Sequence, residues 1–392
     1  MKKVVITHAK RTPIGAFNGT LSSITAPQLG SIAIKAVLDE SGIDKNIIDE
    51  VIMGNVITAG LGQAPARQAA IFAGLPDKTE ALTINKMCGS GLKAVMLAQQ
   101  AIACGDADII IAGGQESMSN APFLIQKARN GYKLGNQTLY DSVLLDGLTD
   151  VFGNVHMGVC AESCAKDFSF TRAELDRYAE QSYRRALAAQ KDGKFTEEII
   201  KVPVKTRTGE IFIDKDEDPE KVNFEKMSTL KPVFDKNGVV TAANASNLND
   251  GASALLIMSE EKAKELGYTP LAEIVAQSSA AKAPVNFTTA PADAIGKVLK
   301  RAGLSASQID LYEINEAFAV VSLAVNKLLG LKEDNVNVNG GAIALGHPIG
   351  ASGARILTTL LYEMKRRSLT YGLASLCIGG GEASALIVKS RK

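Results

Sequence analysis

Apolar and polar positions alternate along the first 118 residues in a way that predicts strands and helices in turn. Compact runs of apolar and β-branched residues, typical of strands, lie at 3–7, near 49–54, near 81–86 and at 108–113. Helical apolar spacing marks 27–41, 64–73 and 92–103. This order predicts an α/β domain with a largely parallel sheet.

Residues 119–247 follow a different pattern, more polar and with long irregular pieces. One helix stands out there, because Thr171 and Glu174 have the spacing of a capping box and the helical pattern continues to about Lys191. We expect this region to be an insertion, partly loop-like, that covers a cleft.

The first pattern returns after about residue 270. The helix-ending glycines Gly42 and Gly303 are 303 − 42 = 261 positions apart, and Gly91 and Gly353, each after a serine, are 353 − 91 = 262 apart. Two copies of one α/β unit predict a pseudo-twofold that brings their strand-to-helix turns to equivalent places. The predicted division is an N-terminal repeat at 1–118 completed by 248–269, an insertion at 119–247 and a C-terminal repeat at 270–392.

Composition narrows the class of protein. The chain has 392 residues, 46% of them hydrophobic and 22% charged, with a formal net charge of +1. These values are ordinary for a globular protein and give no general electrostatic case for nucleic acid or a membrane surface as a partner. No apolar run approaches the roughly 20 residues of a membrane span.

The cysteines and the start of the chain indicate a compartment. The chain turns polar at Lys10 and Arg11, so it lacks the apolar core of a signal peptide. Five scattered cysteines do not suggest a disulfide framework, and Cys160 and Cys164 lack the further ligands of a zinc site. We therefore expect a cytoplasmic protein with reduced thiols and no metal.

The first candidate for chemistry is Cys88, at a turn between a predicted strand and a predicted helix. Gly89 and Gly91 follow it, so the backbone can bend sharply and another group can approach closely. A cysteine at a helix N-terminus favours the thiolate, the nucleophilic form. Two other interpretations remain open: a cysteine packed in the core, and a dinucleotide fingerprint at 89–94 with Glu116 ending the next strand.

The second copy supplies three further candidates. His347 lies in a glycine-dense turn at the position paired with the Cys88 turn, and Cys377 ends a predicted strand before three glycines. Asn315 stands where a strand enters a helix, either as a functional group or as the helix N-cap. These residues suggest acyl chemistry: His347 takes a proton from one thiol, which attacks an acyl carbon, while the other thiol is acid or base toward carbon. Glycine N–H groups would stabilise the oxyanion.

A set of signatures in one order makes the chain recognisable: Asn85–Val95, Gly113–Ser119, His156–Gly158, Thr241–Ser246, Asn249–Ala252, Asn315–Phe318, Gly340–Arg355 and Cys377–Gly381. On these residues the chain resembles the thiolase family over essentially its whole length, and most closely its short-chain members. The resemblance implies duplicated α/β units with mixed sheets in a layered αβαβα arrangement, plus an inserted loop domain. It also implies reversible condensation of two acetyl-CoA to acetoacetyl-CoA and CoA, with these thioesters as substrates and no cofactor.

The resemblance assigns roles to individual residues. Cys88 would carry the acyl group after activation by His347, and Cys377 would remove an α-proton from the second acetyl-CoA. Asn315 would hold a water that forms one oxyanion hole with the His347 ring. The backbone N–H groups of Cys88 and Gly379 would form the other, and the two glycines after Cys88 would give clearance to the oxyanion and thioester.

Further residues are implied as substrate contacts. Ser246 would contact the pantetheine arm of coenzyme A, and Phe318 would lie near the thioester. The acyl pocket would be lined by Leu148, His156 and Met157. The insertion would bind coenzyme A and help to build a homotetramer from two dimers.

Several positions depart from the family pattern. The segment Phe287–Pro291 replaces two glycines beside the expected substrate channel, and Glu382 and Ala383 replace a small or apolar residue and a glycine. Ala243 and Asn247 replace two further glycines, and the Asn247 change is mild because Asn tolerates a left-handed backbone. An arginine expected at the adenine end has no clear equivalent, and Lys221 is the nearest residue to it. These changes leave the reaction centre intact and leave open the acyl-length preference, coenzyme A affinity and turnover, including the effects of Thr288 and Ala290.

Other functions account for less of the sequence. A dehydrogenase explains only the residues after Cys88, and a ketoacyl synthase needs two active-site histidines, whereas only His8, His156 and His347 exist. A 3-ketoacyl-CoA thiolase of longer chain length and a non-catalytic acyl-CoA-binding relative remain as alternatives. The sequence does not indicate whether the cell uses condensation or thiolysis.

Overall fold

The main feature of the fold is one 10-stranded sheet, with the path β14-β15-β16-β13-β1-β12-β5-β3-β4 and β2 paired to β12. The computed structural model describes residues 2–391. The strands of this sheet are β1 (Val4–Arg11), β2 (Gly15–Ala16), β3 (Glu50–Gly54), β4 (Glu80–Ile84), β5 (Ile109–Ser117), β12 (Asn249–Ser259), β13 (Ala272–Ala281), β14 (Leu311–Ile314), β15 (Tyr371–Ile378) and β16 (Glu382–Ser390).

The two halves of the sheet repeat one pairing order. In the N-terminal half β12 lies between β1 and β5 and is antiparallel to both, while β3 is parallel to β5. In the C-terminal half β16 lies in the same way between β13 and β15, and β14 is parallel to β15. The halves meet where Val5 and Ile6 pair with Glu273 and Ala272. The expectation of a largely parallel sheet is wrong, because the last strand of each half returns antiparallel.

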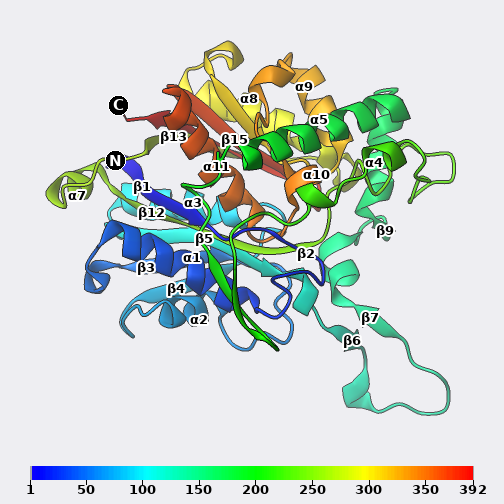
Figure 1. Cartoon of the computed structure of the whole chain (residues 1–392), viewed down its shortest axis with the longest axis horizontal. Helices are drawn as coiled ribbons and strands as arrows, with labels where there is room; N and C mark the ends of the chain where they lie inside the picture. Colours follow the sequence, from blue (N-terminus) through cyan, green and yellow to red (C-terminus); the bar gives the residue numbers. More distant parts are fainter. Residues whose placement is uncertain (1, 392) are drawn as a thin grey trace.

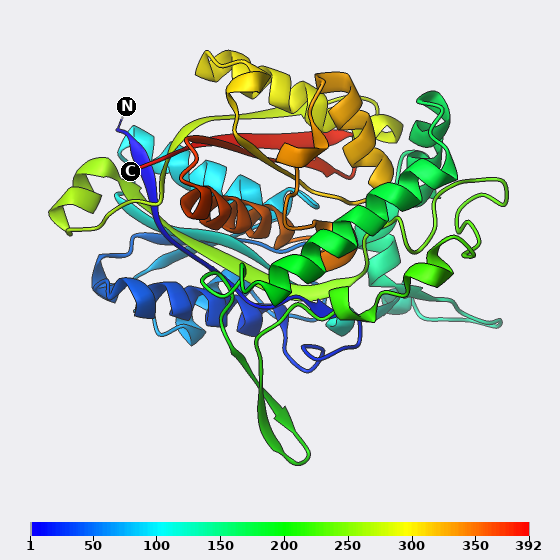
Figure 2. The same ribbon diagram turned by 45° about the horizontal axis from the view of Figure 1, so that its top comes forward.

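Helices cover both outer faces of the sheet and fill the space between its halves. The bounds are α1 (Ala26–Ser41), α2 (Pro65–Phe72), α3 (Ser90–Cys104), α4 (Met157–Asp167), α5 (Arg172–Lys191), α6 (Phe224–Met227), α7 (Glu260–Glu265), α8 (Ala290–Ala302), α9 (Ala319–Leu329), α10 (Ala342–Leu345) and α11 (Ser352–Arg367). Helices α1 and α2 pack on the N-terminal half, α8 and α9 on the C-terminal half, and α3 and α11 side by side between them (Figures 1 and 2). These are the layers of an αβαβα fold.

The segment between β5 and β12 adds hairpins and helices to this frame. Its strands are β6 (Phe123–Ile125), β7 (Leu139–Asp141), β8 (Thr149–Asp150), β9 (Val155–His156), β10 (Val202–Thr206) and β11 (Gly209–Ile213). Thr171 caps α5 through the capping box, as the sequence predicts. The β6–β7 arm projects from the body (Figure 1) and exposes Phe123 and Leu134. Within residues 2–391 we find no helix with the length and apolar character to cross a bilayer.

Candidate active site

A strained turn presents Cys88 at the start of α3. Met87, just before it, has the left-handed φ of 47°, which is uncommon for a residue with a side chain. The Met87 N–H donates to Asn85 Oδ1 at 2.9 Å, and the Lys86 N–H donates to Ser90 Oγ at 2.8 Å. These bonds hold the turn, so the position of the thiol is set by local side chains as well as by the helix.

The two glycines after Cys88 make room for the other half of the protein. A Cβ on Gly89 would lie 2.3 Å from Ile378 Cδ1, and a Cβ on Gly91 would lie 2.8 Å from the Ala354 nitrogen. Close approach is therefore required at both positions, as the sequence predicts. The approaching groups are a side chain beside Cys377 and the backbone of α11. Clearance for an oxyanion and a thioester at these glycines stays a prediction.

The two candidate thiols are neighbours, and both are protonated at neutral pH. Burial raises the pKa of Cys88 to about 11, although the Gly379 and Cys88 backbone N–H groups bond its sulfur and oppose the rise. Burial and the neighbouring Cys88 raise the pKa of Cys377 well above its ordinary value. The prediction that the helix terminus favours a Cys88 thiolate is wrong, because desolvation of the thiolate outweighs the effect of the helix terminus.

His347 is buried, neutral and held from both its backbone and its ring. Its backbone N–H donates to Asn249 Oδ1 at 2.8 Å, and its Nδ1 lies 2.6 Å from Ser352 Oγ. Burial, with a smaller contribution from the Arg355 charge, lowers the pKa of His347 to about 3. The ring therefore enters any reaction as a neutral imidazole, the form that can accept a proton.

Asn315 lies over the His347 ring. Its Nδ2 is 3.5 Å from His347 Nδ1 and 3.4 Å from Nε2. Helix α9 begins at Ala319 with Phe318 at its N-cap, so Asn315 is not the capping residue. Its Oδ1 is buried and has no hydrogen-bond partner among residues 2–391, which leaves it free for a ligand or water beside the imidazole.

Glu116 ties the His347 turn to the N-terminal half. Its carboxylate accepts hydrogen bonds from Asn55 Nδ2, Val56 N, Ile57 N and Gly350 N, at 2.7, 3.0, 3.2 and 2.9 Å. Both oxygens are thus fully used inside the protein. This arrangement argues against the dinucleotide interpretation, in which Glu116 would bind a ribose.

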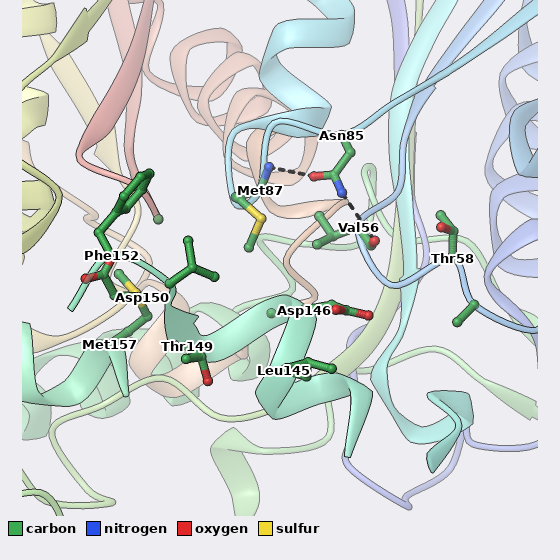
Figure 3. A pocket seen from close by; sticks show the side chains of 15 residues that line it. Val56, Thr58, Asn85, Met87, Leu145, Asp146, Thr149, Asp150, Phe152 and Met157 are labelled. Carbon is green, nitrogen blue, oxygen red and sulfur yellow. Dashed lines mark hydrogen bonds between the residues drawn. The ribbon is translucent and has the colours of Figure 1, made fainter. Parts of the chain in front are cut away.

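A cavity of about 630 Å³ opens beside the thiol turns. It is lined by Met157 and Gly379, both predicted site residues, and by Asn85 and Met87 of the Cys88 turn (Figure 3). Leu148 is partly buried against the small apolar cluster that Cys88 and Met87 also contact. Two of the predicted acyl-pocket residues, Leu148 and Met157, therefore lie around the nucleophile turn.

Aromatic rings cluster around Phe318, and one of them, His156, directly precedes the cavity residue Met157. His156 stacks on Phe234 with ring centroids 4.6 Å apart, and Phe318 meets Phe234 and Phe287 edge-to-face, each at 6.4 Å. The Ser246 hydroxyl donates to the Ala317 carbonyl at 3.0 Å, next to Phe318. The remaining predicted substrate contacts are thus brought together here.

Most of the residues that differ from the family pattern make side-chain contacts with their neighbours in the fold. Glu382 forms an ion pair and a hydrogen bond with Lys86, and so joins the Cys377 strand to the Cys88 turn. Ala383 has no positive φ, so the concern about its backbone does not apply. Asn247 donates to Asp218, which lies beside the Lys221 charge. Thr288 is buried and bonds the thiol of Cys164.

Sequence reasoning missed the residues that support the site. Asn249 and Ser352 both lie within the signatures, but the sequence pattern assigns neither a role at His347. Glu313 and Arg355 form a buried pair, 3.7 Å apart. Glu313 lies on β14, which ends just before Asn315, and Arg355 lies on α11, which begins at Ser352. A charged residue within an otherwise apolar strand or helix, as at Glu313 and Arg355, is a signal in the sequence that could have indicated this buried pair. Among residues 2–391, no group of three His, Cys, Asp or Glu side chains has a metal-binding arrangement.

Known proteins match the chain from end to end. Family models described as the thiolase N-terminal and C-terminal domains match residues 4–261 and 268–390. An acetyl-CoA acetyltransferase of Cupriavidus necator is 53% identical over 393 residues, covering 100% of both chains. A probable acetyl-CoA acetyltransferase of Dictyostelium discoideum is 51% identical, covering 99% of this chain and 94% of its own length.

Solved structures agree with these sequence matches. A thiolase from Ascaris suum in complex with coenzyme A has a TM-score of 0.94 and 44% identity, covering 99% of this chain and 100% of its own. Human mitochondrial 3-ketoacyl-CoA thiolase has a TM-score of 0.96 and 42% identity, covering 99% of each chain.

Proposed function

The chain belongs to the thiolase family, and from this premise we propose that it is an acetyl-CoA C-acetyltransferase with Cys88 as the acyl-carrying nucleophile. The proposed activity is the one that names the full-length relatives, which are 51% and 53% identical to this chain. The single observation that supports the residue roles is the pair of neighbouring thiols, with backbone N–H groups on the Cys88 sulfur. The neutral, buried imidazole of His347 lies in the turn between α10 and α11, against Asn315.

The first half-reaction forms the acyl-enzyme. His347 accepts the Cys88 proton as the sulfur attacks the thioester carbonyl of acetyl-CoA, because a thiol of high pKa is a poor nucleophile until it is deprotonated. The Gly379 and Cys88 N–H groups, which already point at the sulfur, stabilise the oxyanion beside it. The imidazolium then returns the proton to the departing CoA thiolate.

The second half-reaction joins two acetyl groups. Cys377 first loses its own proton to solvent and then, as a thiolate, removes an α-proton from a second acetyl-CoA. The enolate oxygen takes donors from His347 and a water held by Asn315. The carbanion attacks the acetyl carbonyl on Cys88, giving acetoacetyl-CoA and a free Cys88 thiolate that is reprotonated. Two acetyl-CoA thus give one acetoacetyl-CoA and one CoA, with no cofactor consumed.

Substrate contacts and assembly form the finer part of the proposal. Ser246 would contact the pantetheine arm, and Phe318 would lie near the thioester with Phe287 beside it in the substrate channel. Leu148, His156 and Met157 would line the acyl pocket. The exposed apolar β6–β7 arm favours a homotetramer, since such surface marks protein contacts. Five cysteines without paired spacing favour the cytoplasm.

Brief exposure to acetyl-CoA followed by peptide mass spectrometry tests the nucleophile. We expect one acetyl group on Cys88, none after Cys88→Ala, and unchanged labelling after Cys104→Ala, which removes an exposed cysteine far from the site. Acetylation that persists in Cys88→Ala would reject the assignment. No acyl transfer in the wild type would favour the non-catalytic alternative.

Thiolysis of 3-ketoacyl-CoA substrates of increasing length separates the acetyl-specific enzyme from a broader thiolase. The structural likeness to a 3-ketoacyl-CoA thiolase makes this comparison necessary. We expect the highest kcat/KM for acetoacetyl-CoA, since Met157 Cε would lie only 3.8 Å from a Cβ on Gly379 and so limits the space for a longer acyl chain beside Cys88. Higher activity on longer chains would reject acetyl specificity while leaving the nucleophile in place.

A further inference from the structure

One side chain distinguishes the two ring nitrogens of His347. Asn315 Nδ2 lies 3.5 and 3.4 Å from Nδ1 and Nε2 and so favours neither. Ser352 Oγ lies 2.6 Å from Nδ1 alone. Both Ser352 and His347 are buried, with exposed fractions of 0% and 5%. This contact therefore decides which nitrogen carries the hydrogen.

Ser352 has one hydroxyl hydrogen and two acceptors within reach. The Pro348 carbonyl lies 2.9 Å from Oγ, and His347 Nδ1 lies 2.6 Å away. If the hydrogen goes to Pro348, the oxygen accepts from Nδ1–H and Nε2 keeps a lone pair. If it goes to Nδ1, then Nε2 carries the hydrogen and is no longer a base. The two assignments give opposite tautomers.

The equivalent serine of the first repeat supports one assignment. Ser90 donates its hydroxyl to the Met87 carbonyl at 2.7 Å and accepts the Lys86 N–H at 2.8 Å. A backbone N–H can only donate, so the roles of Ser90 are certain. The bond from Ser352 to the Pro348 carbonyl is the ordinary back-bond of a serine in the first turn of a helix, and that carbonyl also accepts the Ser352 N–H.

We propose that Ser352 is a positioning residue that accepts a hydrogen bond from His347 Nδ1–H while donating to Pro348, and so keeps Nε2 free as the base for Cys88. This inference rests on the proposed function. In each repeat a serine that opens the central helix would thus donate to a carbonyl behind it and accept a hydrogen from the catalytic turn. In the first repeat that hydrogen is an amide, and in the second it belongs to the imidazole.

The arrangement suits both states of the ring. When Nε2 takes the Cys88 proton, the imidazolium still donates Nδ1–H to Ser352, so no second proton has to move. Without Ser352 the ring is free to take the other tautomer or to turn over. We expect Ser352→Ala to lower both kcat and the rate of Cys88 alkylation by iodoacetamide about 10–100-fold, the scale for a buried hydrogen bond. The KM for acetyl-CoA should change less than about threefold, since Ser352 contacts the ring and not the substrate.

The tautomer is read directly from ¹⁵N chemical shifts in magic-angle-spinning NMR of histidine-labelled full-length protein, which contains three histidines. We expect a protonated Nδ1 and an unprotonated Nε2 at His347 in the wild type, and loss of this pattern in Ser352→Ala. Ser352→Thr keeps the hydroxyl and should restore the pattern and most of the rate. Ser278→Ala, which removes a buried hydroxyl bond to the Ala294 carbonyl, should change neither.

The remaining outcomes of these experiments reject either the inference about Ser352 or the proposed function. A protonated Nε2 in the wild type, or an unchanged pattern in Ser352→Ala, overturns the inference. So does a wild-type alkylation rate in Ser352→Ala. Because the NMR experiment needs no substrate, a wild type with the expected tautomer that never acetylates Cys88 would reject the proposed function alone. If Ser352→Ala does not fold, the wild-type tautomer and the Ser352→Thr rates still decide.

Discussion

Glu116→Gln removes one acceptor oxygen from the buried junction between the two halves of the protein. The carboxylate accepts four hydrogen bonds, two on each oxygen, from Asn55, Val56, Ile57 and Gly350. An amide keeps one oxygen and turns an NH₂ group toward the other two donors. Two buried N–H groups then lose their acceptor, at about 1–3 kcal/mol each. We therefore expect a loss of roughly 2–6 kcal/mol in the local stability of these turns.

Hydrogen exchange measured by mass spectrometry reports this loss without requiring reversible unfolding. At 1.4 kcal/mol per factor of ten, even a loss of about 2 kcal/mol speeds exchange of the Val56, Ile57 and Gly350 amides roughly 30-fold. Because Gly350 follows His347 in the same turn, kcat should fall as well. Peptides from the centre of β12 should exchange at the wild-type rate until global unfolding dominates.

Glu261→Gln is the matched control, since it makes the same chemical change at an exposed carboxylate on α7. Its exchange and activity should stay at wild-type values. If Glu116→Gln left exchange of the 55–57 and 348–352 peptides unchanged, Glu116 would not hold these turns, and the structural reasoning about the junction would be refuted.

Two further predictions concern charged pairs near the site. In a double-mutant cycle on the Cys88 alkylation rate, Lys86→Met and Glu382→Gln should show a coupling energy of about 0.5–1 kcal/mol at low salt. The coupling should be smaller at high salt, because the ion pair is partly exposed. Additive effects of the two mutations at low salt would contradict a link between the two turns. Burial raises the pKa of Glu313 to about 8 despite Arg355 nearby. The stabilising contribution of the protonated Glu313 is therefore complete below about pH 4.5 and is lost as pH rises through 8. In urea unfolding, the free energy of unfolding of the wild type should fall by ~2–5 kcal/mol relative to Glu313→Gln over that range. Parallel pH profiles of the two proteins would contradict this prediction.

The sequence predicted what depends on local spacing or on the repeat. The capping box of α5 and the helix-ending Gly42 and Gly303 involve contacts within a few residues, so their structure follows from the pattern. The repeat offset also paired Ser90 with Ser352 before either had a role. Recognisable signatures then supplied the fold family and the reacting groups.

The sequence failed where distant segments meet. Glu116 receives donors from 59 to 234 positions away, so its role is invisible in the local pattern. The Cys88 thiolate was predicted from the helix terminus alone, whereas the desolvation that raises its pKa comes from the surrounding fold. The antiparallel return of β12 similarly depends on a strand that follows the whole insertion.

The strand order has a consequence for the protein as it is made. In each half the last strand in sequence, β12 or β16, lies between strands made earlier, so neither half of the sheet closes until its final strand arrives. Cys377 follows Cys88 by 377 − 88 = 289 residues. At roughly 5–20 residues per second of synthesis, Cys88 spends about 15–60 s without its partner thiol and without α11 packed against Gly91. During that interval the reactive turn and the apolar face of α3 are open to other chains, and protection comes only with the last strand.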